Sequence, residues 1–202
     1  MLMVTVAWDL DDVLNSLMRE WFEAAWLPEH PSCTVTYAEI VENPPHRVLG
    51  ISEAEYLASL DHFRLSDDAR RMLPNDEVLD WLGMHGGSVR SLVLTARPLP
   101  SVGPAAEWLF RHFGGYIRTF SVVPMRLAEG LPALDSTKKS FLQWLGKVDV
   151  LVDDSAANCA DACSLGMRGI LFPQPWNGNR ATIAETLELL RSVCFDCNPQ
   201  PN

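Results

Sequence analysis

The sequence predicts an α/β protein with a doubly wound parallel sheet and a small helical cap inserted after the first strand. Short apolar runs that end in turn residues alternate with amphipathic segments along most of the chain. Such alternation is typical of a parallel sheet with helices on both faces. One long helical stretch interrupts it after the first strand. We therefore expect a core from 1–15 and 85–202 and a cap from 16–84. A chain of 202 residues is long enough to bury the apolar core of such a domain and to carry an additional small unit.

The expected first strand is an apolar run that ends in three acids. It extends from Val4 to Trp8 and is followed by Asp9, Asp11 and Asp12. Asp9 and Asp11 are two residues apart, so an extended backbone directs both to the same side. Converging carboxylates repel one another unless a cation lies among them, and they are oxygen ligands suited to Mg²⁺. This motif indicates phosphoryl transfer through an aspartyl-phosphate, although alone it fits an acidic turn equally well.

The expected cap begins with an amphipathic helix. Its apolar residues recur at three- and four-residue steps and share one helix face: Leu14, Leu17, Met18, Trp21, Phe22, Ala25 and Trp26. A proline-rich loop follows, and shorter helices are expected over 52–60 and 67–82. Most aromatic residues of this segment are expected to pack inside the cap, and one or two are candidates for stacking on a nucleobase.

Strands and helices alternate after the cap. Strands are expected near 89–94, 117–123, 148–152 and 168–172, and helices near 104–113, 136–145, 156–165 and 180–193. Gly114 and Gly166 lie where two of these helices are expected to end. The carboxyl ends of parallel strands meet at one edge of the sheet, where ligands bind in such folds. The polar residues that follow the strands are therefore the candidate site.

Thr95 and Ala96 follow the second expected strand, and Pro98 prevents its continuation. The Thr95 hydroxyl and the next backbone N–H groups, beginning with Ala96, can bind phosphate oxygens. A threonine in an ordinary turn is the alternative interpretation.

Lys138 and Lys139 lie in the first turn of an expected helix that Ser136 or Asp135 can cap. The helix dipole disfavours a cation at this end, so a lysine here is better explained if it reaches an anion. Lys138 is favoured because apolar residues then follow one turn later on the core-facing side. Lys139 remains an alternative, as does a solvated surface lysine.

Asp153 and Asp154 end another apolar run, and Ser155 can cap the helix that follows. Two adjacent acids at a strand end do not contribute to the stability of the fold, because they repel each other. They are well suited to bind a metal ion.

These four motifs, in this order, resemble those of the haloacid dehalogenase superfamily of phosphatases and phosphotransferases, which has a Rossmann-like fold. The resemblance implies a magnesium-dependent phosphomonoester hydrolase whose cap closes over the site. Its residues would be the nucleophile Asp9, the general acid and base Asp11, the phosphate-binding Thr95, Ala96 and Lys138, and the metal ligands Asp9, Asp11, Asp153 and Asp154. Asp12 stands where many members have glycine, although an acid also occurs there.

The loop from Leu171 to Asn179 is similar to one in the 5′(3′)-deoxyribonucleotidase-like branch, which implies a nucleoside monophosphate as the first candidate substrate. Two alternatives remain open. One is a hydrolase of sugar or other metabolite phosphates, and the other is a non-catalytic or regulatory binding protein on the same fold. A dehalogenase is disfavoured because that chemistry has no use for Asp11 or for a metal-binding acid pair.

Sixteen basic and 26 acidic residues give a net charge of −10. This argues against nucleic acid polymers and anionic membranes as partners, since both require a basic surface. A small phosphomonoester is the expected partner. The protein is expected to be cytoplasmic because no signal-peptide pattern is evident. It is expected to be a monomer or a homodimer. Cys159, Cys163, Cys194 and Cys197 form two close pairs that would hold zinc if they met in space. Small buried hydrophobic residues are the simpler interpretation of these cysteines.

Overall fold

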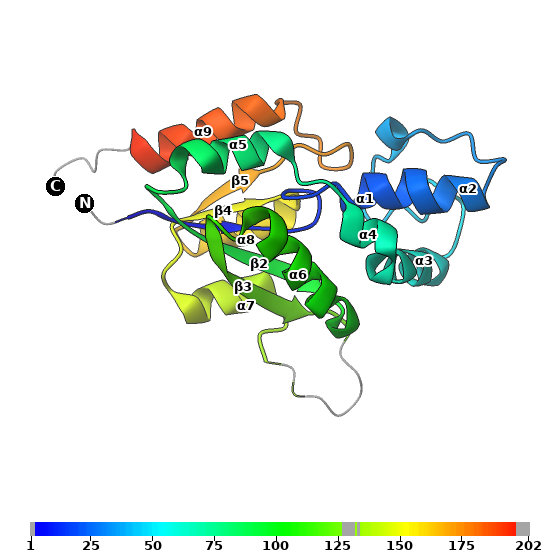
Figure 1. Cartoon of the computed structure of the whole chain (residues 1–202), viewed down its shortest axis with the longest axis horizontal. Helices are drawn as coiled ribbons and strands as arrows, with labels where there is room; N and C mark the ends of the chain where they lie inside the picture. The colour runs from blue at the N-terminus through cyan, green and yellow to red at the C-terminus, as the bar shows by residue number, and fades with distance from the viewer. Residues whose placement is uncertain (1–2, 127–131, 133, 197–202) are drawn as a thin grey trace.

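The fold is built on a five-stranded, fully parallel sheet in a computed structural model that describes residues 3–126, 132 and 134–196 (Figure 1). The strand order is β3-β2-β1-β4-β5. The strands are β1 (Thr5–Trp8), β2 (Arg90–Arg97), β3 (Ile117–Pro124), β4 (Val150–Asp153) and β5 (Arg168–Leu171). This confirms the predicted α/β class with its doubly wound sheet.

Helices cover both faces of the sheet. The first face carries α5 (Asp76–His85), α6 (Val102–Phe113) and α9 (Ile183–Phe195), whose apolar side chains pack in one cluster with Val6 and Trp8. The second face carries α7 (Lys138–Leu145) and α8 (Ala156–Ser164), which contribute to a separate cluster with Ala7. Neighbouring residues of β1 thus point to opposite faces, as the two-residue period of a strand requires.

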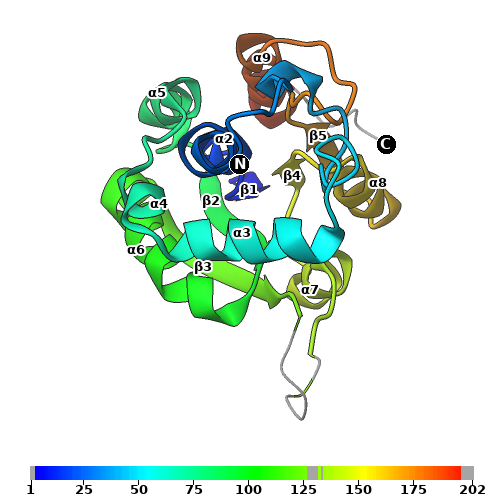
Figure 2. The ribbon, with the colours of Figure 1, turned by 90° about the vertical axis from the view of Figure 1, so that its right-hand side faces the viewer.

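The cap has an apolar core of its own, which includes Trp21, Phe22, Trp26 and Tyr56. Its elements are α1 (Leu17–Glu20), a π-helical segment (Trp21–Trp26), α2 (Leu27–Glu29), a 3₁₀ turn (Tyr37–Glu39), α3 (Glu53–Leu65) and α4 (Asp67–Arg71). Figure 2 shows α3 crossing in front of the carboxyl ends of the strands. The cap therefore lies over the edge at which the sequence places the candidate site.

All of the helix α5 except its last residue, His85, lies inside the range 16–84 predicted for the cap, but its buried residues pack in the first sheet cluster. Figure 1 shows it beside α9. The physical reason is the topology: β1 and β2 are parallel neighbours, so a helix must cross over the sheet between them. Where the chain leaves and returns from the cap, the N–H of Asn75 donates to the carbonyl of Leu14 at 2.8 Å.

The chain reverses its direction across the sheet between β1 and β4. The β1 strand connects onward to β2 and β3 on one side, whereas β4 and β5 lie on the other. Ligands bind at such a switch point because the loops after the two central strands diverge and leave a crevice. Asp9 follows β1 directly and Asp153 is the last residue of β4, and Asp9 N–H donates to Val152 O at 2.9 Å. No helix of the described chain is both long and apolar enough to cross a membrane.

Candidate active site

Three buried carboxylates meet at the carboxyl ends of β1 and β4. Asp9, Asp153 and Asp154 each offer an oxygen atom, and these atoms lie within 4.8 Å of one another. In the part of the chain that the structure describes, this is the one cluster of three or more acidic, histidine or cysteine side chains with such spacing. The parallel register of β1 and β4 causes the convergence, because it ends both strands at the same level.

Lys138 is the cation among these acids. Its Nζ lies 2.6 Å from Asp9 Oδ2 and 2.7 Å from Asp153 Oδ2, and its side chain is 4% exposed. Burial opposes the charge of Lys138, but the Asp9 and Asp153 carboxylates outweigh it and raise its pKa. Lys139 instead pairs with Asp161 on the surface, where its side chain is 41% exposed. Of the two lysines, the structure therefore places Lys138 at the acids.

The helix cap that positions Lys138 differs from both predicted candidates. Thr137 is the N-cap of α7, and its hydroxyl accepts a hydrogen bond from Ser140 N–H at 3.1 Å. The helix consequently begins at Lys138, later than the predicted start at 136. The prediction of Ser136 or Asp135 as the cap was wrong because several adjacent polar residues can cap a helix, and their sequence does not rank them.

The charges of the cluster fit a divalent cation. When all three carboxylates are ionised, they and the one ammonium leave two negative charges in a buried space, which is unfavourable without a further cation. Burial raises the pKa of Asp9 to about 8, with Lys138 opposing the shift and Asp153 and Asp154 adding to it. Burial and the Asp153 charge likewise raise the pKa of Asp154 to about 6. Oxygen donors with two uncompensated charges match the preference of Mg²⁺.

Asp11 faces a different partner from the other acids. Both of its oxygens accept from Arg97, at 2.8 Å from Nε and 2.6 Å from Nη2. The cap residue Arg64 places Nη2 at 3.7 Å from the same carboxylate. Burial opposes ionisation of Asp11, but Arg97 and then Arg64 outweigh it and lower its pKa. The carboxylate is thus ionised and held between a core arginine and a cap arginine.

Asp12 turns the chain away from β1. Its φ is +60°, a left-handed conformation that glycine adopts most readily and aspartate tolerates. Its Oδ1 accepts from Met18 N–H at 2.9 Å, so the side chain fixes the start of the cap helix. This accounts for an acid at a position where members of the family that the motifs resemble often have glycine. Burial and the Asp154 charge raise the pKa of Asp12 well above its ordinary value.

The loop after β5 donates hydrogen bonds to two of the acidic residues. Trp176 Nε1 donates to Asp154 Oδ2 at 2.9 Å, and Gln174 Nε2 donates to Asp12 O at 2.6 Å. Gln174 also accepts from the hydroxyl of Tyr37 in the cap, and the Tyr37 ring packs edge-on against Trp176. The loop therefore joins both acid pairs to the cap. The indole of Trp176, in the loop that resembles the nucleotidase branch, is thus engaged with protein groups.

A cavity of about 380 Å³ lies between cap and core in front of the acids. The core side is lined by Asp9, Asp11, Asp12, Thr95, Ala96, Met125, Arg126 and Asp154, and the cap side by Leu17, Met18, Asn43, Pro44, Glu53, Tyr56, Leu57, Leu60 and Arg64. Thr95 and Ala96 thus share the cavity with Asp9. Among the described residues that line this cavity, Tyr56 is the one with an aromatic side chain.

Two arginines of this site are not among the predicted site residues. Arg97 follows Thr95 by two residues on β2, so the strand period places both on one side, and this spacing was a usable signal. Arg64 lies at the end of α3, more than 50 residues from Asp11 in sequence, and no local pattern connects them. Asn158 was also missed, although its Nδ2 donates to Asp153 Oδ1 at 3.0 Å from the first turn of α8.

The cysteine pairs do not come together in the described structure. Cys159 and Cys163 lie on α8, whereas Cys194 lies on α9, and these helices cover opposite faces of the sheet. Cys197 lies outside the described residues. Since Cys194 and the α8 pair are separated by the sheet, the structure gives no support to a shared zinc site.

Solved structures with the same architecture include haloacid dehalogenase-like proteins. No family profile and no curated protein matches the chain. A haloacid dehalogenase-like family hydrolase from Streptococcus pneumoniae is similar with TM-score 0.60 and 11% identity, covering 94% of this chain and 97% of its own. Protein tyrosine kinase A from Mycobacterium tuberculosis is similar with TM-score 0.63 and 20% identity, covering 92% and 97%.

A second hydrolase, from Streptococcus pneumoniae TIGR4, gives TM-score 0.60 at 12% identity over 95% of this chain and all of its own. At these identities the likeness establishes the fold. The chain therefore has the haloacid dehalogenase fold, as its motifs predicted. What it does must be argued from the site itself.

Proposed function

We propose that this protein is a Mg²⁺-dependent phosphomonoester hydrolase that acts through an aspartyl-phosphate on Asp9. The observation that carries the proposal is the meeting of Asp9 with Lys138, Asp153 and Asp154 at the floor of a cavity that Thr95 also lines. A nucleophile, a fixed cation, a metal-ligand set and a phosphate-binding hydroxyl are the parts that phosphoryl transfer requires. A non-catalytic protein has no need to keep all of them in one buried place.

The proposed reaction has two steps. In the first, a carboxylate oxygen of Asp9 attacks phosphorus in line, and the bond from phosphorus to the leaving oxygen breaks as Asp11 gives that oxygen a proton. Arg97 and Arg64 keep Asp11 ionised in the free protein. Asp11 therefore takes up this proton from solvent when the negatively charged phosphate ester binds beside it, before the first step. In the second, Asp11 takes a proton from water, which attacks phosphorus and releases Asp9. Lys138 and the Thr95 hydroxyl stabilise the charge on the remaining phosphoryl oxygens in both steps.

Asp9, Asp153 and Asp154 would hold the metal ion. A bound Mg²⁺ supplies positive charge to the phosphoryl oxygens and keeps the ligand carboxylates ionised. The carboxylate of Asp11, predicted as a further ligand, faces Arg97 instead of the cluster. Its contribution to metal binding stays a prediction.

The direct test is hydrolysis of nitrophenyl phosphate by the purified protein. We expect release of nitrophenol with added Mg²⁺ and its loss on addition of excess chelator, with recovery when Mg²⁺ is restored. Activity that persisted unchanged in chelator would contradict the metal requirement.

Metal binding is also expected to change how stability depends on pH. The pKa values of Asp9, about 8, and Asp154, about 6, lie above their ordinary value of 3.8. Between pH 3.8 and about 8, the folded protein therefore binds more protons than the unfolded chain. Stability therefore falls as pH rises through this window. We expect the melting temperature of metal-free protein to drop by roughly 5 °C or more between pH 5 and pH 8.5.

Added Mg²⁺ binds the ionised carboxylates and should offset most of this drop. At a concentration 100 times its dissociation constant, a ligand of the folded state stabilises by about 2.7 kcal/mol. Thermal unfolding followed by circular dichroism measures both curves. Identical pH profiles with and without Mg²⁺ would argue that the three acids do not bind it.

Within this class, we propose nucleoside monophosphates as the first substrates to test. The support is the volume of the cavity and the edge of Tyr56 that lines it; the rest of this ring packs in the cap core, and the residue is 3% exposed. Contact between a base and an aromatic ring contributes on the order of 1–3 kcal/mol. That energy corresponds to a roughly ten- to hundredfold higher kcat/KM than for sugar phosphates of equal charge. Steady-state kinetics on both classes of substrate measures the ratio.

Tyr56→Leu should reduce this ratio toward one. The ratio is the right readout because a partly unfolded variant lowers both rates alike and leaves it unchanged. Sugar phosphates that equalled nucleotides with the native protein would contradict the nucleotide assignment and leave the phosphatase proposal intact.

A further inference from the structure

Arg97 is a buried arginine that grips both oxygens of Asp11. Its Nε and Nη2 donate to Oδ2 and Oδ1 at 2.8 and 2.6 Å. Its third donor, Nη1, lies 3.4 Å from the carbonyl of Ser101 in the turn after β2. A planar guanidinium that binds a carboxylate through two parallel hydrogen bonds fixes its rotation as well as its place. Arg97 is itself fixed, because it lies at the end of β2, an interior strand of the sheet, and is 3% exposed.

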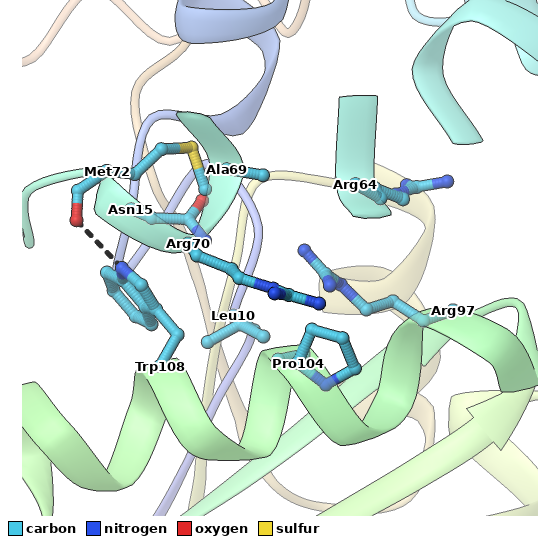
Figure 3. A pocket seen from close by; sticks show the side chains of 10 residues that line it. Leu10, Asn15, Arg64, Ala69, Arg70, Met72, Arg97, Pro104 and Trp108 are labelled. Carbon is cyan, nitrogen blue, oxygen red and sulfur yellow. Dashed lines mark hydrogen bonds between the residues drawn. The ribbon is translucent and has the colours of Figure 1, made fainter. Parts of the chain in front are cut away.

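The surroundings of Arg97 leave it no substrate to bind directly. Figure 3 shows the guanidinium groups of Arg97 and Arg70 directed toward each other, with Arg64 nearby. The cavity that they line has a volume of about 10 Å³, the size of a single water molecule. Among the described residues that line the large cavity, Asp11 is present and Arg97 is not. Arg97 can therefore act on a ligand in that cavity only through Asp11.

We propose that Arg97 is the positioning residue for Asp11, holding its carboxylate where it meets the leaving oxygen. The inference rests on the proposed function, in which Asp11 passes a proton to that oxygen. The terminal torsion of an aspartate is broad, so a carboxylate without a two-point partner has more rotational freedom. Without Arg97, Asp11 would keep only the longer contacts with Asn15 Nδ2 at 3.3 Å and Arg64 Nη2 at 3.7 Å. A general acid, however, must lie within hydrogen-bond reach of the atom that it protonates. Arg97 exchanges no proton in either step; it orients Asp11, and its charge stabilises the ionised form that takes the proton from water in the second step.

The test compares two esters that differ in their need for an acid. Nitrophenolate leaves without protonation, whereas an alkoxide requires it. We expect Arg97→Ala to lower kcat for an alkyl phosphate by roughly 10- to 100-fold and for nitrophenyl phosphate by a much smaller factor. Arg97→Lys keeps the positive charge without the two parallel donors, so it should retain the selective loss. Added guanidinium ion should partly restore the alkyl phosphatase activity of Arg97→Ala.

Arg191 provides a matched control. It forms the same type of arginine-carboxylate contact, with Nε at 3.0 Å from both oxygens of Glu188, but on the outer surface of α9. Arg191→Ala should leave the ratio of the two activities unchanged. If Arg97→Ala does not fold by circular dichroism, Arg97→Lys carries the comparison.

A double-mutant cycle separates positioning from general structural support. If Arg97 acts through Asp11, Arg97→Ala in an Asp11→Asn background should cost little further activity. Equal losses on both esters, a gain in alkyl phosphatase activity, or full additivity with Asp11→Asn would each overturn the inference. Hydrolysis that depends on Asp9 but not on Arg97 refutes this inference alone, whereas hydrolysis that survives Asp9→Asn refutes the proposed function.

Discussion

Asp9→Asn is expected to abolish the hydrolysis of nitrophenyl phosphate, lowering kcat by roughly 10⁴-fold or more. The amide keeps the size of the side chain but lacks the charged oxygen that attacks phosphorus. It also removes one of the three proposed metal ligands. Because no aspartyl-phosphate can form, the variant should show no burst of nitrophenol in rapid-mixing experiments. Steady-state kinetics measures the loss of kcat, and pre-steady-state kinetics measures the loss of the burst.

Asp149→Asn is the matched control for this change. Asp149 precedes β4, at the opposite end of the strand that Asp153 terminates, and its Oδ2 accepts from Thr5 N–H at 2.7 Å. The same chemical change there should leave kcat within about twofold, since it touches no part of the cavity. A mechanism in which Asp9 is the nucleophile cannot accommodate an active Asp9→Asn variant, whatever Asp149→Asn shows.

Lys138→Ala is expected to impair both rate and stability. The ammonium contacts Asp9 and Asp153, and it is the cation placed to neutralise phosphoryl oxygens. Removing one such preorganised donor typically costs about 10²–10³ in kcat. Its loss also leaves buried carboxylates uncompensated, which destabilises a protein by about 3–5 kcal/mol. Kinetics and urea unfolding measure these losses, and Mg²⁺ should restore part of the stability because it supplies positive charge to the same acids.

Lys139→Ala tests the same chemistry one residue away. Its ammonium pairs with Asp161 at 2.9 Å on the surface, where such pairs contribute about 0–1 kcal/mol. Activity should stay within about twofold of the native protein. The reverse outcome, with Lys139→Ala inactive and Lys138→Ala active, would show that α7 presents a different side to the site.

Much of the fold follows from local sequence patterns. The strands after the cap were predicted within a few residues because apolar β-branched runs end in turn residues, as in β4 and β5. The convergence of Asp9, Thr95 and Asp153 was predictable for a more general reason: parallel strands end at one edge, so residues that follow them are neighbours in space. No contact information was needed for that step.

Contacts between distant segments were beyond such reasoning. An amphipathic pattern shows that α5 buries one face, but it does not show whether that face packs on the cap or on the sheet. The partner of Asp11 was missed similarly, because a bidentate contact between Arg97 and Asp11 depends on side-chain geometry across two strands. The role of Trp176 was also not decided by its position in sequence. A tryptophan next to a site can stack on a base, or it can donate a hydrogen bond to an acid, as Trp176 does to Asp154.

The hydrogen bond between Asn75 and Leu14 has an evolutionary consequence. It brings together the two points at which the chain leaves the sheet domain and returns to it, so the intervening segment begins and ends at one spot. Beyond that spot it contacts the sheet domain through side chains such as Arg64, which lies near Asp11, and Tyr37, which donates to Gln174. Insertions with adjacent ends are tolerated because they leave the host's contacts intact. The cap core and the sheet clusters also have no residue in common. Lineages can therefore lengthen, shorten or exchange this segment, and with it the molecules that they accept, while inheriting the chemistry of the acids unchanged.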